Sequence, residues 1–64
     1  MTGVIKSFSR QHGYGFIETD REANIFFHVK DWIGNGKPSI GQRVEFMWVE
    51  SEKGLRAIRI RGIR

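Results

Sequence analysis

Hydrophobic and polar positions alternate most clearly between residues 42 and 50 of the chain. Val44, Phe46 and Trp48 share one side of an extended backbone, opposite the side on which Arg43 lies. Such alternation is typical of a β-strand with one buried face and one face toward water. We therefore expect a strand here, with Val44, Phe46 and Trp48 in the hydrophobic core.

Four other segments have hydrophobic residues at strand-like spacing, and glycine-rich or polar connections separate them. The predicted strands span residues 3–10, 14–19, 25–29, 42–50 and 55–61, and the predicted turns and loops span 11–13, 20–24, 34–39 and 51–54. Residues 30–33 are too few for a full helix and suit a single helical turn. Five short strands without a long helix predict an all-β fold, a five-stranded antiparallel β-barrel of the OB-fold type.

The two strands at residues 14–19 and 25–29 are predicted to carry aromatic side chains on a face away from the core. Alternation places Tyr14 with Phe16, and Phe26 with His28. The opposite faces of these strands are apolar and, with the fourth strand, already fill a core for a chain of 64 residues. The rings of Tyr14, Phe16 and Phe26, with the imidazole of His28, are therefore expected to form a surface on which unpaired nucleic-acid bases stack.

The charge balance favours a polyanionic partner. Eleven Lys and Arg against seven Asp and Glu give a net charge of +4, and seven of the eleven are arginines. Four arginines lie on or after the last predicted strand: Arg56, Arg59, Arg61 and Arg64. Because phosphate groups attract such clusters, we expect RNA or DNA as the partner.

Other classes of function find little support in the sequence. No nucleophile and base lie at catalytic spacing, and no pair of carboxylates shares a face, so we expect no enzyme and no small-molecule substrate. His12 and His28 alone do not make a metal site, and a chain without cysteine has no thiolate ligands or disulfides. No apolar run approaches membrane-spanning length, so we expect a cytoplasmic protein without membrane contact. We also expect no cofactor.

Four sequence motifs resemble those of the cold shock domain, a small nucleic-acid-binding barrel of bacteria. Residues 3–9 match its opening pattern Gly-x-Val-Lys-Trp-Phe-Asn, and residues 12–17 match its first ribonucleoprotein motif. Residues 25–29 match the second such motif, and residues 41–46 match Gly-Gln-x-Val-x-Phe. The resemblance implies a monomeric domain over residues 1–64 that binds single-stranded RNA or DNA with low sequence specificity and acts as a nucleic-acid chaperone or a regulator of transcription or translation.

The chain departs from the family pattern at aromatic positions. Ser7 stands where the family has a base-stacking Trp, and Val29 stands where it has an exposed Phe. The loop at residues 34–39 lacks a further aromatic that many members carry. Since each stacked base is worth about 1–3 kcal/mol, we expect weaker and more salt-dependent binding than is typical of the family.

The residues expected to contact nucleic acid come from the strand pattern and from the resemblance. They are Lys6, Phe8, His12, Tyr14, Phe16, Phe26, His28 and Arg56. Phe8 suits either ligand contact or the core, because the first strand bends. His12 takes the position of a family lysine, and Arg56 lies nearest a position that the family uses for ligand contact. Trp32 is expected to cap one end of the barrel.

A second hypothesis belongs to a different class of function. The same barrel, with Ser7 and Val29 in place of aromatics, suits an accessory or protein-interaction domain that binds nucleic acid weakly and mainly through charge. Such a domain can also be a piece of a larger protein. Substitution of Phe16 and Phe26 by alanine distinguishes the two hypotheses, because only the first requires the rings.

Overall fold

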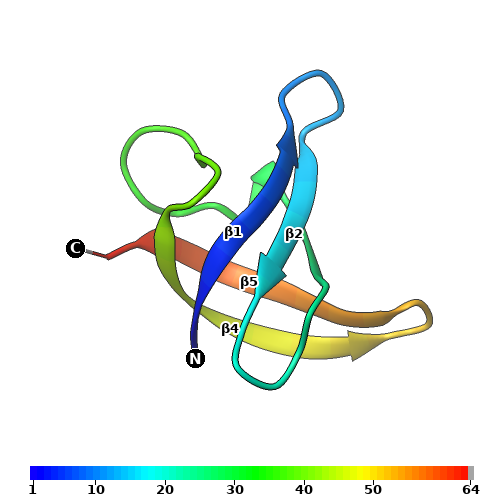
Figure 1. The fold of residues 1–64 in the computed structure, drawn as a ribbon. Helices are drawn as coiled ribbons and strands as arrows, with labels where there is room; N and C mark the ends of the chain where they lie inside the picture. Colours follow the sequence, from blue (N-terminus) through cyan, green and yellow to red (C-terminus); the bar gives the residue numbers. More distant parts are fainter. Residues whose placement is uncertain (64) are drawn as a thin grey trace.

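The computed structural model describes residues 1–63 and contains the five strands that the sequence predicts (Figure 1). The elements are β1 (Thr2–Ser9), β2 (Tyr14–Glu18), β3 (Ile25–His28), the 3₁₀ turn η1 (Val29–Asp31), β4 (Arg43–Ser51) and β5 (Gly54–Gly62). The predicted bounds agree to within one or two residues, the usual uncertainty of strand ends. Arg64, one of the clustered arginines, lies outside the described residues.

The strands close into a barrel in the order β1-β2-β3-β5-β4, which confirms the predicted fold. Neighbouring strands pair antiparallel, except that β3 meets β5 in parallel at Phe26 and Arg56. Closure leaves few unpaired backbone groups at sheet edges, which matters for a domain that lacks disulfides. The parallel contact also brings the last strand beside the aromatic face of β3.

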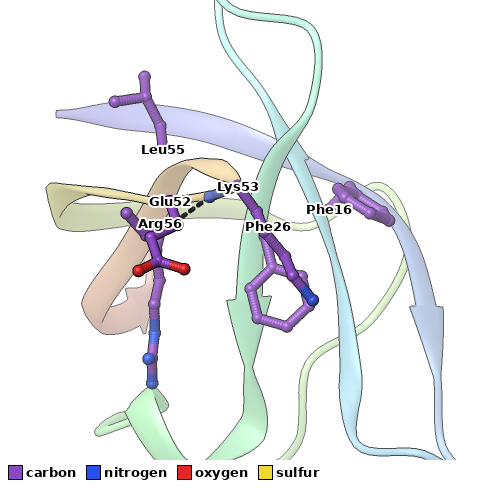
Figure 2. A pocket seen from close by; sticks show the side chains of 7 residues that line it. Phe16, Phe26, Glu52, Lys53, Leu55 and Arg56 are labelled. Atoms are coloured by element: carbon purple, nitrogen blue, oxygen red, sulfur yellow. Dashed lines mark hydrogen bonds between the residues drawn. The ribbon is translucent and has the colours of Figure 1, made fainter.

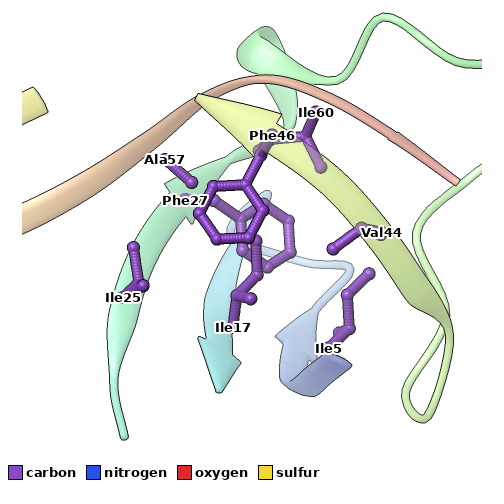
Figure 3. Packing of buried hydrophobic residues seen from close by; sticks show 8 residues of the cluster. All are labelled: Ile5, Ile17, Ile25, Phe27, Val44, Phe46, Ala57 and Ile60. Carbon is purple, nitrogen blue, oxygen red and sulfur yellow. The ribbon is translucent and has the colours of Figure 1, made fainter. Parts of the chain in front are cut away.

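The hydrophobic core occupies the inside of this barrel (Figure 3). Its buried members are Ile5, Ile17, Ile25, Phe27, Val44, Phe46, Ala57 and Ile60. Every strand contributes to the set, and each large side chain is worth about 1.5–3 kcal/mol when removed from water. Trp32, directly after η1, packs against the core and forms an isolated bridge with Ile60, in keeping with its predicted position at the barrel end.

The prediction that Trp48 belongs to the core is wrong, because Trp48 is 42% exposed. Val44 and Phe46 on the same side of β4 are buried, so the alternation itself holds. The difference lies in what faces each residue: β1 pairs with β4 only from Arg43 to Glu45. Beyond that point the β4–β5 hairpin extends past β1 (Figure 1), and within residues 1–63 the pairing of β4 continues with β5 alone, so Trp48 lies on a part of β4 that β1 does not reach.

Candidate nucleic-acid interface

The aromatic side chains of β2 and β3 lie together on the outside of the barrel. Tyr14 pairs with His28, and Phe16 pairs with Phe26, in the antiparallel register that the alternation requires. The Tyr14 and Phe26 rings lie 5.8 Å apart between centroids, and the Phe16 and Phe26 rings lie 6.0 Å apart. We call Tyr14, Phe16, Phe26 and His28 the aromatic platform. The predicted juxtaposition of these four residues is therefore confirmed.

The rings of the platform hold one another in fixed orientations while staying accessible. Phe16 meets Phe26 nearly edge to face, at an interplanar angle of 74°, and Tyr14 is tilted by 33° from Phe26. Such contacts between aromatic edges and faces are favourable beyond simple burial. Tyr14 is 39% exposed, and the other three residues are half-buried. The arrangement offers several ring surfaces to flat, unpaired bases.

His12 extends the aromatic surface beyond Tyr14. Its imidazole stacks on Tyr14 with centroids 5.8 Å apart and an interplanar angle of 24°. The residue belongs to the exposed β1–β2 turn, where its backbone N–H donates to the Ser9 hydroxyl. A ring in this position can stack on a base, and its nitrogens remain available for hydrogen bonds.

The orientation of His28 is fixed by the backbone that follows it. Its Nδ1 accepts a hydrogen bond of 3.1 Å from the backbone N–H of Lys30, and the residue caps η1. In the neutral ring the remaining proton therefore lies on Nε2, which makes that atom a hydrogen-bond donor. His28 thus presents a donor at the end of the platform, suited to a base carbonyl or a phosphate oxygen.

A groove of about 560 Å³ adjoins the platform at Phe16 and Phe26 (Figure 2). Its other lining residues come from the β4–β5 turn and the start of β5: Ser51, Glu52, Lys53, Leu55 and Arg56. Lys53 supplies an exposed positive charge beside the rings, and Leu55 supplies an apolar wall. Sequence reasoning missed both residues, since only the long-range contact of β3 with β5 brings the turn to the platform.

Arg56 lies next to Phe26 on the neighbouring strand, but part of its charge is already engaged. Its guanidinium donates to the Asp31 carboxylate at 2.8 Å, with side chains that are 43% and 22% exposed. The pair is partly buried, and the carboxylate lowers the positive potential that Arg56 offers to a phosphate. Arg56 therefore acts more as a wall of the groove than as a free cation.

Another arginine of the last strand is also paired. Arg61 donates through Nε to the Glu45 carboxylate at 2.9 Å across β4 and β5. This hydrogen bond, with the positive charge of the guanidinium, holds the pKa of the Glu45 carboxyl below its ordinary value. The ion pair belongs to the β4–β5 surface and not to the platform, so Arg61 does not extend the candidate interface.

Strand β1 borders the platform beside Phe16, at the position where this chain lacks an aromatic side chain. Ser7 pairs with Phe16 and is exposed. The position at which the cold shock motif has Trp therefore lies directly beside the central ring of the platform. Lys6 is exposed and donates to Asn24 Oδ1 at 3.4 Å. The serine leaves a gap in the aromatic surface that neighbouring side chains do not fill with a ring.

Phe8 contributes to the core as well as to the surface. Its ring stacks on the buried Phe27, with centroids 5.8 Å apart and planes within 10° of parallel. The residue is only half-buried, and it lines a surface depression with Arg10, Lys37 and Pro38. One face of the ring is therefore committed to packing, and only its exposed part is open to a ligand.

Within residues 1–63, no group of three or more His, Cys, Asp or Glu is placed to hold a metal ion. A search of the same residues finds no helix of the length and hydropathy that a membrane crossing requires.

A closed five-stranded barrel with aromatic rings on its outer face defines a class of small nucleic-acid-binding domains. Comparison with known proteins agrees: residues 1–63 match the family model described as the 'Cold-shock' DNA-binding domain. The chain belongs to the cold shock domain family and is a nucleic-acid-binding domain, not an enzyme. The resemblance read from the four motifs is therefore confirmed.

Individual relatives cover nearly the whole chain. A cold shock-like protein of Aquifex aeolicus is 44% identical over 62 residues, which are 92% of this chain and 89% of that protein. The cold shock protein CspA of Staphylococcus aureus is 37% identical over 60 residues, 91% of each chain. A solved structure of Drosophila Unr, termed CSD456, has a TM-score of 0.82 and 32% identity, over 98% of this chain and 26% of that one.

Proposed function

We propose that residues 1–64 bind single-stranded RNA or DNA, with loose sequence preference, by stacking bases on the aromatic platform. The observation that carries this proposal is the register of β2 and β3, which gathers Tyr14, Phe16, Phe26 and His28 on one exposed face. Every base has a π-face, so a surface of rings accepts many sequences. Lys6 and Lys53 border this face and are suited to hold the phosphate backbone.

The biological use that we propose is that of a nucleic-acid chaperone. A protein that binds only the open form of a weak hairpin shifts the equilibrium toward that form by mass action, without ATP or a cofactor. The proposal includes a monomeric state and a cytoplasmic location, as the resemblance to bacterial cold shock domains implies. Regulation of transcription or translation follows from the same activity when the melted structure lies in a transcript.

The test is the opening of a short RNA hairpin with a weak stem, labelled with a fluorophore and a quencher at its ends. We expect fluorescence to rise with protein concentration in the absence of ATP, over the range in which a linear strand of the same sequence is bound. A hairpin with a long GC-rich stem serves as the control and stays closed. Failure to bind the linear strand, or binding without opening at saturation, would refute the chaperone function.

Binding is also expected to depend on salt. Lys53 lines the groove beside the platform, Lys6 precedes Ser7, which pairs with Phe16, and Arg10 and Lys37 line the depression at Phe8. Binding to a single strand releases about 0.7 counterions for each neutralised phosphate. For more than two such contacts, the slope of log affinity against log salt concentration should be steeper than about −1.4. Lys53→Gln should make this slope shallower by about 0.7, whereas Arg43→Gln, on the β1–β4 side, should not. A wild-type slope shallower than −1.4 contradicts the expectation.

The alternative function, an accessory barrel with mainly electrostatic binding, is less well supported. Arg56 and Arg61 are paired with Asp31 and Glu45, which reduces the charge that the last strand offers to a polyanion. The rings, in contrast, remain accessible. The alternative predicts that binding survives the loss of Phe16 and Phe26 and disappears on charge reversal of the arginines.

A further inference from the structure

The exposed Trp48 lies in a second groove, apart from the platform. The groove has a volume of about 390 Å³ and lies between the β2–β3 turn and the β4–β5 hairpin. Its lining residues are Met1, Thr2, Thr19, Asp20, Arg21, Glu22, Trp48 and Leu55. Trp48 is 42% exposed as a residue and lies in this groove, so it presents an apolar side chain that neither the core nor the platform uses.

Both walls of this groove are held in place by backbone structure. On one side, the Thr19 hydroxyl accepts hydrogen bonds from the backbone N–H groups of Arg21 and Glu22, and Thr19 N–H donates to the Glu22 carbonyl. On the other side, Trp48 pairs with Ala57 in the β4–β5 ladder. The indole is therefore presented by rigid elements, which reduces the entropy that a ligand must remove on binding.

The second groove is continuous with the candidate interface through one side chain. Leu55 lines both this groove and the one that adjoins Phe16 and Phe26. A strand whose bases stack on the platform can therefore continue past Leu55 to Trp48. We infer that Trp48 is a further stacking position for a base of the same bound strand. This inference rests on the proposed function and extends it to longer ligands.

The charges around Trp48 indicate which part of a nucleotide enters the groove. Asp20 and Glu22 are carboxylates that repel a phosphate but accept hydrogen bonds from the N–H groups of a base. Arg21, between them in the sequence, can hold a phosphate at the edge of the groove. A base stacked on the indole can donate hydrogen bonds to the carboxylates, while its phosphate stays outside the groove and contacts Arg21.

The position of Trp48 also changes the extent of the aromatic surface, which has a gap at Ser7. Ser7 removes a ring beside Phe16, whereas Trp48 adds a ring on the far side of Leu55. The aromatic surface is thus displaced toward the β4–β5 hairpin rather than simply reduced. A ligand must then be longer than the platform to gain the additional stacking, so affinity should rise with strand length beyond the platform.

The experiment compares labelled pyrimidine strands of four and ten nucleotides, titrated with wild type and Trp48→Leu by fluorescence anisotropy. Leucine keeps an apolar side chain in the groove and removes the ring. We expect Trp48→Leu to weaken binding of the ten-nucleotide strand by at least about fivefold, the lower end of one stacking interaction, and to leave the four-nucleotide strand within twofold. Trp48→Phe, which keeps a ring, should recover most of the lost affinity.

The intrinsic fluorescence of Trp48 gives an independent readout. The ten-nucleotide strand should quench tryptophan emission more than the four-nucleotide strand does, and Trp48→Leu should abolish this difference. Equal affinities of wild type and Trp48→Leu for both strands would overturn the inference while leaving the platform function intact. Equal loss for both strands would also overturn it, since Trp48 would then support the fold. Absence of wild-type binding to either strand refutes the proposed function itself.

Discussion

Replacement of Phe16 by alanine is expected to weaken binding of a short single-stranded pyrimidine oligonucleotide by at least tenfold. Stacking on one aromatic ring contributes about 1–3 kcal/mol, which corresponds to roughly 5- to 150-fold in affinity. Phe16 lies at the centre of the site: it pairs with Phe26, borders Ser7 and lines the adjoining groove. Its loss also removes the edge-to-face contact that orients the Phe26 ring. Fluorescence anisotropy at low salt measures the effect.

Met47→Ala provides the matched control for this substitution. Met47 is a large hydrophobic residue of β4 that is 58% exposed, and it lines neither the platform nor the groove beside it. Its replacement removes comparable apolar surface without touching the proposed site, so binding should stay within twofold of wild type. If Phe16→Ala behaves like Met47→Ala while charge reversal of the arginines abolishes binding, the rings are not the site and the electrostatic alternative gains support.

The platform could be predicted from the sequence because its geometry is local. Alternation along a strand fixes which residues share a face, and only the pairing of β2 with β3 had to be assumed. The two strands are separated by a short turn, which favours their pairing as neighbours. The positions of Tyr14, Phe16, Phe26 and His28 follow from these two facts, and the structure agrees with each of them.

The misplacement of Trp48 has a different origin. The same alternation correctly placed Val44 and Phe46 inside, but it carries no information on where the barrel ends. That limit is set by how far β1 runs along β4, a contact between residues about 40 positions apart in the chain. The ion pair between Arg56 and Asp31 could not be predicted for a similar reason, since the two residues lie 25 positions apart in the sequence.

Replacement of Gly15 by alanine is expected to have the largest effect on stability. A Cβ atom on Gly15 would lie 2.1 Å from the Ser7 carbonyl oxygen and 2.9 Å from the Phe8 Cα, both parts of the backbone of β1. The third neighbour, the ring of the buried Phe27, would be only 3.0 Å away. Room for the methyl group therefore requires the backbone of β1 to move away from β2 and the Phe27 ring to shift in the core.

We expect Gly15→Ala to lower the free energy of unfolding by about 3 kcal/mol or more, at the upper end of overpacking effects. For a domain of this size, that change corresponds to a decrease in melting temperature of at least about 12 °C. Thermal unfolding followed by circular dichroism measures it. Gly36→Ala is the control: its Cβ meets no atom within 4 Å, and only the positive φ of +74° opposes it, at about 1–2 kcal/mol.

Gly15 links this stability to the proposed binding surface. It lies between Tyr14 and Phe16 in β2, and it pairs with Phe8 of β1 on one side and with Phe27 of β3 on the other. The close approach of β1 that it permits keeps β2 paired with both neighbours, in the register that places Tyr14 and Phe16 on the same outer face. Gly15→Ala should therefore lose binding along with stability although every platform ring remains. A variant that melts near wild type would show that the strands accommodate the methyl group and that this close approach is dispensable.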